Sequence, residues 1–170
     1  MRIETERLII TELTLDMAEA VHLNSLDEDT RRFVPDEVFE TTETAREAVT
    51  DLIACYDTAD GPFVYAVLLK DSGENIGYVQ LVTVPEGWEI GYHIAKGHTG
   101  RGYATEAVRA FLPVIAAERG LKRVEGVCLM DNTASARVLE KCGFRPVYQG
   151  IGHYQGEERE IIRCRWTIKD

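Results

Sequence analysis

The amino-acid sequence predicts a single mixed α/β domain in which a sheet is flanked by helices. Strand-like segments alternate with amphipathic helical segments in the order β-α-α-β-β-β-α-β-α-β-β, which counts seven strands and four helices. A chain of 170 residues is long enough for one domain with its own core, so we take residues 1–170 as one unit.

The first third of the chain holds one strand and two helices. Residues 8–13 have strand patterning, and a helix is expected over residues 17–26. The polar segment 27–41 is expected to be a loop or a broken helix. Thr44 and Glu47 match a capping box, which predicts the start of the next helix there. One face of that helix collects Ala45, Val49, Leu52, Ile53 and Tyr56.

Three strands are expected in the middle of the chain. Residues 63–69 and 76–84 form a hairpin around the turn at 71–73, and residues 88–95 follow a second turn at 85–87. A glycine-rich loop at 97–102 then opens a helix.

The helix after the loop has a continuous apolar face. Pro113 lies within this face and should kink the helix, and Gly120 should end it. The apolar face consists of Ala104, Ala107, Val108, Phe111, Leu112 and Ile115.

The remaining elements are a strand, a short helix and two further strands. The strand covers residues 124–130, and the helix covers 132–142 and stops at Gly143. Residues 144–149 form the sixth strand. Apolar and polar residues alternate over 162–168, which predicts a half-buried last strand.

Charge and cysteine content restrict the class of protein. The formal net charge is −10, opposite to that of a nucleic-acid-binding surface or of a protein docked on anionic lipid. It favours a basic acceptor such as an amine, or it serves solubility alone. Four scattered cysteines without a CxxC pair predict neither disulfides nor a metal site. With no signal peptide and no membrane span in the sequence, we expect a cytoplasmic protein.

The glycine loop is the most informative stretch. Gly100 and Gly102 allow a sharp turn and a close approach of the backbone to a ligand, and the first amides of the following helix can bind phosphate. Arg101 adds a positive charge. No Gly-Lys-Ser/Thr follows, as a Walker A loop requires, and the glycines do not fit GxGxxG. A plain strand-to-helix turn stays open as an alternative.

Two motifs resemble the GNAT N-acetyltransferases. Gly102 and Ala104 match the fourth and sixth places of the signature Arg/Gln-x-x-Gly-x-Gly/Ala, while Thr99 replaces its Arg or Gln. Residues 103–107, Tyr-Ala-Thr-Glu-Ala, and residues 5–8, Thr-Glu-Arg-Leu, resemble the branch that acetylates ribosomal-protein N-termini, the Rim-type branch. Residues 132–144 resemble the Asn-x-x-Ser-x-x-x-x-Glu-Lys-x-Gly-Phe helix of that branch.

The resemblance implies a fold and a ligand. The fold is a mostly antiparallel seven-stranded sheet, splayed between its fourth and fifth strands and flanked by about four helices. The ligand is acetyl-CoA, used as a co-substrate and bound in the splay. The residues implied in binding it are Ile94, Thr99, Gly100, Arg101, Gly102, Ala104, Thr105, Asn132 and Lys141. Asn132 alternatively only caps its own helix.

The chemistry of amine acetylation needs a base for the amine and an acid for the leaving thiolate. By resemblance Ser135 is the acid. Glu89 is the candidate base, because the neighbouring Trp88 and Ile90 would raise the pKa of its carboxyl group. An inert serine and a solvated carboxylate are the alternatives. His93 and His98 rank below Glu89 as bases, and Tyr148 and Tyr154 are reserve acids.

The sequence therefore predicts an enzyme that moves an acetyl group to a primary amine. The acceptor is a protein or peptide N-terminus or a small amine, and residues 27–61 line its site. The alternative is a CoA-binding regulatory module without transferase activity. An exposed final strand would allow two copies of the chain to pair as a homodimer.

Overall fold

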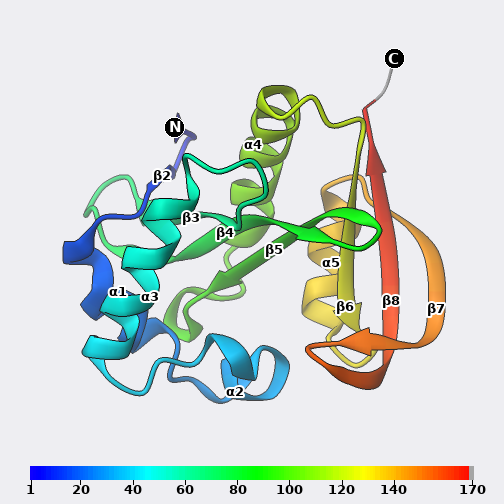
Figure 1. Cartoon of the computed structure of the whole chain (residues 1–170), viewed down its shortest axis with the longest axis horizontal. Coiled ribbons are helices and arrows are strands. Elements are labelled where there is room, and N and C mark those ends of the chain that lie inside the picture. The colour runs from blue at the N-terminus through cyan, green and yellow to red at the C-terminus, as the bar shows by residue number, and fades with distance from the viewer. Residues whose placement is uncertain (169–170) are drawn as a thin grey trace.

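The computed structural model describes residues 1–168, which form one eight-stranded sheet with helices on both faces (Figure 1). The sheet order is β1-β2-β3-β4-β5-β6-β8-β7, and neighbouring strands are antiparallel except β5 and β6. The strands are β1 (Arg2–Glu4), β2 (Leu8–Glu12), β3 (Phe63–Leu69), β4 (Asn75–Val84), β5 (Gly87–Ile94), β6 (Arg123–Leu129), β7 (Arg145–Tyr154) and β8 (Glu157–Thr167). The strand beyond the predicted seven is β1, whose three residues are too short to show alternation.

Five α-helices and three 3₁₀ turns lie in the described part of the chain. The helices are α1 (Ala18–Asn24), α2 (Glu28–Phe33), α3 (Thr42–Cys55), α4 (Tyr103–Glu118) and α5 (Thr133–Lys141), and the 3₁₀ turns are η1 (Leu15–Met17), η2 (Pro35–Glu37) and η3 (Lys96–His98). None of the helices within residues 1–168 has the length and apolar character needed to cross a membrane.

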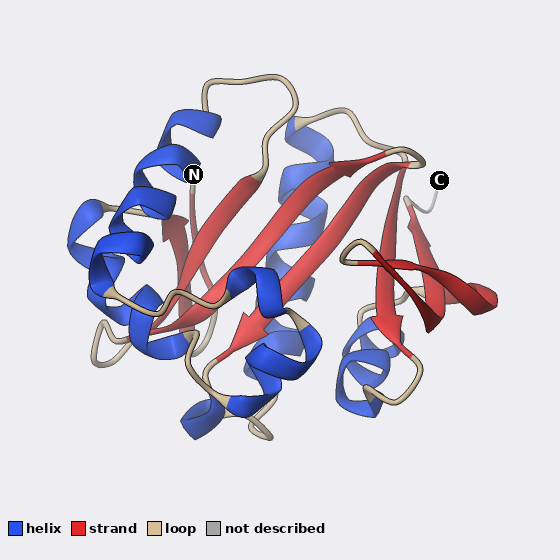
Figure 2. Ribbon diagram, turned by 60° about the horizontal axis from the view of Figure 1, so that its bottom comes forward, coloured by secondary structure: helices blue, strands red, loops and turns tan. Residues whose placement is uncertain are grey.

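The helices divide the core between the two faces of the sheet (Figures 1 and 2). Phe63, Tyr65 and Val67 of β3 point into a cluster with α4, while Val64 and Ala66 point into a second cluster with α1 and α3. Both faces of β3 are therefore buried, which explains why its sequence is a continuous apolar run.

The segment between α1 and α3 is a broken helix, one of the two predicted forms. Asp27 caps α2 by accepting a hydrogen bond from the Thr30 amide at 2.8 Å, and Pro35 begins η2. The predicted capping box was wrong. It is formed by Thr41 and Thr44, whose side chains bond each other's amides at 3.1 and 3.3 Å, so α3 begins before Thr44. A second threonine here replaces the usual Glu or Gln.

The helix α4 continues through Pro113 as one element of 16 residues. The proline removes one N–H from the ladder, but the buried face extends past it to Ile115 and Ala116. Gly120, with φ 65°, ends the helix as predicted, and the amide of Leu121 donates to the Ala116 carbonyl at 2.8 Å.

The sheet is splayed between β5 and β6, as the resemblance implied. These two strands pair only at Glu89 and Glu125, after which they separate (Figure 2). On its other edge β5 pairs with β4, and the Ala95 amide still donates to the Ile76 carbonyl at 2.8 Å. Because backbone groups alternate in direction along an antiparallel strand, the amides of Tyr92 and Ile94 face the gap.

The last two strands form a long hairpin whose extent was underestimated. β7 runs to Tyr154 and β8 starts at Glu157. The prediction ended the sixth strand early because Gly150 and Gly152 resemble loop residues in the sequence. A side chain at Gly152 would lie 2.4 Å from Ile161, so this position needs glycine for packing. The prediction of an exposed final strand was wrong, because β8 lies between β6 and β7 and the edge strand is β7.

Candidate active site

The glycine loop leads from β5 into α4 and leaves the first turn of that helix open to a ligand. Gly100 and Gly102 have φ of 75° and 81°, which glycine adopts without strain. Gly102 is the N-cap and has no side chain that could bond the first amides of the helix. The first backbone hydrogen bond of α4 runs from the Glu106 amide to the Gly102 carbonyl at 3.0 Å. The amides of Tyr103, Ala104 and Thr105 thus lack intrahelical acceptors at the positive end of the dipole.

An ion pair from the N-terminal segment braces this loop. Glu106 lies in the first turn of α4, where its charge would repel an anion, but Arg7 binds it through Nη2 at 2.6 Å. Thr5 donates to the same carboxylate at 2.6 Å. Burial alone would raise the pKa of Glu106, but the hydrogen bonds from Thr5 and Arg7 outweigh it and hold the pKa below its usual value.

Arg7 also reaches the loop itself. Its Nη1 donates to the Arg101 carbonyl at 2.9 Å, and its guanidinium lies 4.5 Å from the centre of the Tyr103 ring. Thr99 closes the preceding turn by donating to the Lys96 carbonyl at 2.9 Å. The loop is therefore held in place from both sides before any ligand binds.

A pair of hydroxyl groups bridges the gap between β5 and α5. The hydroxyls of Tyr92 and Ser135 lie 2.8 Å apart, and Tyr92 also lies 3.0 Å from the Ser135 carbonyl. Both contacts are satisfied when Tyr92 donates to the carbonyl and accepts from the serine. Burial raises the pKa of Tyr92, so its proton is retained at neutral pH. Asn132 caps α5 by accepting from the Ser135 amide at 3.2 Å, which is the alternative role considered for it and leaves its amide nitrogen available.

The opposite face of β5 carries Glu89. Burial, with Glu86 and Glu125 nearby, raises the pKa of Glu89 to about 7, while Arg163 acts against this. The pKa of Glu89 is shifted upward, as predicted. The predicted cause was wrong, because Trp88 and Ile90 precede and follow Glu89 in the strand and so face the other side of the sheet.

A second carboxylate, Glu37 of η2, lies over the same face and was missed in the sequence. Burial raises the pKa of Glu37 to about 7, and Gln80 donates to its Oε1 at 3.3 Å. Gln80 can reach across β5 because its paired residue is Gly91, where a side chain would lie 2.6 Å from the Gln80 amide nitrogen. Burial raises the pKa of Tyr154 to about 12, and the charges of Glu37 and Glu89 act in the same direction.

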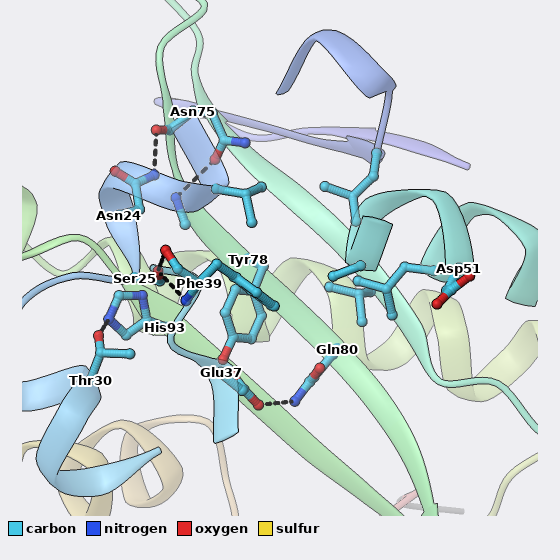
Figure 3. A pocket seen from close by; sticks show the side chains of 16 residues that line it. Asn24, Ser25, Thr30, Glu37, Phe39, Asp51, Asn75, Tyr78, Gln80 and His93 are labelled. Atoms are coloured by element: carbon cyan, nitrogen blue, oxygen red, sulfur yellow. Dashed lines mark hydrogen bonds between the residues drawn. The ribbon is translucent and has the colours of Figure 1, made fainter. Parts of the chain in front are cut away.

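A pocket of about 360 Å³ opens on this face, beneath α1 and α3 and above β3, β4 and β5 (Figure 3). At one side of it His93 lies 2.7 Å from the Thr30 hydroxyl, and Thr30 in turn bonds Asp27 at 3.0 Å. His93 is thus held in a structural contact with α2. His98 lies elsewhere, bonded to Glu74 at 3.1 Å.

Comparison with known proteins identifies the family. The model of the acetyltransferase (GNAT) domain matches residues 7–145, which is most of the chain. The chain belongs to the GNAT acetyltransferase family. It is 30% identical to the uncharacterized N-acetyltransferase YoaA of Bacillus subtilis, over 96% of this chain and 97% of that protein.

Solved structures agree with this assignment. A GNAT-family acetyltransferase from Bacillus anthracis superposes with a TM-score of 0.83 at 27% identity, over 98% of both chains. The ribosomal L7/L12 α-N-protein acetyltransferase RimL, solved in complex with coenzyme A, shares the fold with a TM-score of 0.84 at 18% identity, over 99% of this chain and 98% of that one. The protein is thus an acyl-CoA-dependent acetyltransferase with a fold like that of Rim-type enzymes.

The predicted cofactor-binding residues of this GNAT protein, together with Ser135, fall into two groups and one outlier. The first group is the loop and first turn of α4, and the second is the gap with Ile94, Asn132 and Ser135. Lys141 lies at the far end of α5, roughly 9 Å along the axis from Ser135, and its carbonyl accepts from Arg109 at 3.0 Å. Tyr148 bonds the Ile151 carbonyl on the exposed hairpin, away from both groups.

Proposed function

We propose that the protein transfers the acetyl group of acetyl-CoA to a primary amine, borne by a protein or peptide N-terminus or by a small molecule. The observation that carries this proposal is the arrangement of β5 at the splay. A half-buried carboxylate, Glu89, lies on one face of the strand, and the hydroxyl pair of Tyr92 and Ser135 lies on the other. A base and an acid thus flank the backbone edge that faces the gap.

The chain offers groups that suit each part of acetyl-CoA. The uncapped amides of Tyr103, Ala104 and Thr105, with Gly100 and Gly102 at positive φ, suit a pyrophosphate. The gap-facing amides of Tyr92 and Ile94 suit the pantetheine amides and the thioester carbonyl. When bound, acetyl-CoA supplies the acetyl thioester, from which the acceptor gains an N–C bond as the C–S bond breaks.

Glu89 removes a proton from the acceptor amine. A carboxylate with a pKa of about 7 is a far better base at neutral pH than an exposed one, and it is still half ionised there. Ser135 gives its proton to the departing sulfur, and the hydroxyl of Tyr92, 2.8 Å away, then turns to donate a hydrogen bond to the serine oxygen. After the products leave, Glu89 releases the amine proton to water and Ser135 regains a proton from water, so the proton balance closes.

The test is calorimetric titration with acetyl-CoA, comparing the unmodified protein with Gly102→Val. Micromolar binding, about −8 kcal/mol, is expected for the unmodified protein. Valine at φ 81° costs about 1–2 kcal/mol in backbone strain, which favours another loop conformation and displaces the amides that bind the anion, so at least a tenfold loss of affinity is expected.

Gly97→Val is the matched control, since Gly97 lies in the same loop with open space around it and without a positive φ. It should bind acetyl-CoA nearly as well as the unmodified protein. Binding without turnover for any amine would favour the regulatory CoA-binding module instead. No binding by the unmodified protein would refute both functions.

A further inference from the structure

The pocket beneath α1 and α3 is lined mainly by aliphatic and aromatic groups. Most of its lining is apolar, and Tyr78 and Phe39 lie across its middle (Figure 3). Its volume of about 360 Å³ is within the range of small-molecule sites and has room for an aromatic or branched aliphatic group. The aliphatic wall consists of Leu13, Val21, Ala48, Leu52 and Val64.

The charges around the pocket favour a cation. Glu37 and Asp51 are the acidic residues of its lining, and no lysine or arginine lines it within residues 1–168. His93 is the one basic side chain there, and burial lowers its pKa despite the nearby Asp27. A ligand with one positive charge matches this lining, whereas an anionic ligand would be repelled.

Several other polar groups of the pocket are already paired with the protein, but the buried side-chain amide nitrogen of Asn75 has no partner among the described residues. Asn24 donates to the Asn75 carbonyl at 2.8 Å, Ser25 donates to the His22 carbonyl at 2.8 Å, and Thr30 bonds His93. A ligand rich in hydroxyl or ammonium groups would have to break these bonds or leave its own groups unpaired, at a cost for each. Glu37 differs, because the hydrogen bond to its side chain within the described residues is a long one of 3.3 Å from Gln80.

Glu37 connects the pocket to the reacting face of β5. Its partner Gln80 crosses β5 at Gly91, and Glu89 is two residues before Gly91 on the same face, about 7 Å away along the strand. An ammonium group at Glu37 would therefore lie between the apolar pocket and the candidate base.

We propose that this pocket receives the carbon skeleton of the acceptor, so that the acceptor is a primary amine on an aromatic or branched aliphatic group, with its ammonium at Glu37. The proposal rests on the acetyl transfer proposed above and specifies its substrate class. This chemistry occurs in free arylalkylamines and in peptides whose first residue is aromatic or aliphatic, where the side chain fills the pocket and the α-amine meets Glu37.

The experiment is calorimetric titration of the protein, saturated with CoA, with four probes. They are 2-phenylethylamine, its neutral counterpart 2-phenylethanol, a tetrapeptide amide beginning with Phe, and spermidine. We expect 2-phenylethylamine or the peptide to bind at least tenfold more tightly than spermidine, and whichever binds more tightly identifies the source of the amine. In Glu37→Gln the preference for 2-phenylethylamine over 2-phenylethanol should disappear.

Two substitutions in α3 test the pocket itself. Ala48→Phe fills it and should weaken binding of 2-phenylethylamine or the peptide at least tenfold. Ala54→Phe introduces the same side chain at an exposed position of the same helix and should leave binding unchanged. Val21→Phe, from the opposite helix α1, serves if Ala48→Phe does not fold.

Either of two results would overturn the substrate assignment. One is spermidine binding as tightly as the aromatic probes, and the other is equal effects of Ala48→Phe and Ala54→Phe. Both readouts are binding measurements that need no turnover. If acetyl-CoA binds and amines are acetylated but the pocket variants have no effect, the substrate assignment fails while the proposed function stands. If 2-phenylethylamine or the peptide binds in the pocket but no acetyl group is transferred, the proposed function fails while the assignment of the pocket's ligand stands.

Discussion

Replacing Glu89 by Gln should make the protein slower but more stable at alkaline pH. In the folded protein the pKa of Glu89 is raised from an ordinary value of 4.5 to about 7. Since a tenfold change in proton affinity is worth about 1.4 kcal/mol, ionised Glu89 costs the folded state about 3 kcal/mol at pH 8. Glutamine is neutral at every pH and avoids this cost.

The sign of the pH dependence follows from the direction of the shift. A carboxyl whose pKa is raised on folding contributes its full stability below pH 4.5, and the contribution is lost as the pH rises through 7. The difference in unfolding free energy between Glu89→Gln and the unmodified protein should therefore grow by roughly 2–3 kcal/mol in favour of the variant from pH 5 to pH 8.

Urea denaturation at pH 5 and pH 8 measures this difference, and acetylation assays on the same samples measure the loss of rate. We expect kcat to fall by about 10²–10⁴-fold if Glu89 is the base. Glu47→Gln, at an exposed position of α3, is the control and should show neither effect. If Glu89→Gln is destabilised equally at both pH values, the carboxylate is solvated and the reasoning from its burial is refuted.

Further substitutions test the hydroxyl pair of Tyr92 and Ser135 and the ion pair of Arg7 and Glu106 that holds the loop. Ser135→Ala should slow turnover about tenfold or more with little change in acetyl-CoA affinity. Because the two hydroxyls act together, Tyr92→Phe should lower kcat less in the Ser135→Ala background than in the unmodified protein. Additive losses in kcat would show that they act separately. Arg7→Ala removes the positive charge that neutralises Glu106 beside the anion site, so calorimetry should give an acetyl-CoA affinity at least several-fold weaker. Recovery of that affinity in Arg7→Ala with Glu106→Gln would confirm the cause, and an unchanged affinity in Arg7→Ala would exclude a role for the brace.

Local sequence patterns predicted the fold where each element carries its own signal. The hairpin of β3 and β4 and the ends of α4 and α5 follow from turn residues and from glycine at the helix ends, which are short-range effects. β1 escaped detection because three residues show no period. The predicted hairpin of β7 and β8 was too short because Gly150 and Gly152 resemble turn residues, although Gly152 packs against Ile161 across the hairpin and Gly150 against Tyr148 of its own strand.

The candidate site was predicted only as far as it is local. The glycine loop is contiguous in the chain, so its anion-binding character could be read directly from the sequence. Tyr92 and Ser135 are 43 residues apart, and Arg7 is 99 residues from Glu106, so their contacts depend on how the sheet is assembled. Glu37 comes from a segment without periodicity, and nothing near it in the sequence indicates that the fold buries its carboxylate.

The single pairing of Glu89 with Glu125 gives the sheet an internal edge strand. Beyond that pair the gap-facing side of β5 presents unpaired backbone groups, as the outermost strand of an open sheet does. A flexible ligand with its own amides can dock there much as a peptide adds a strand to a sheet. Binding would then join the two halves of the molecule, so a thermal melt followed with and without ligand would report mechanical coupling between them as well as affinity.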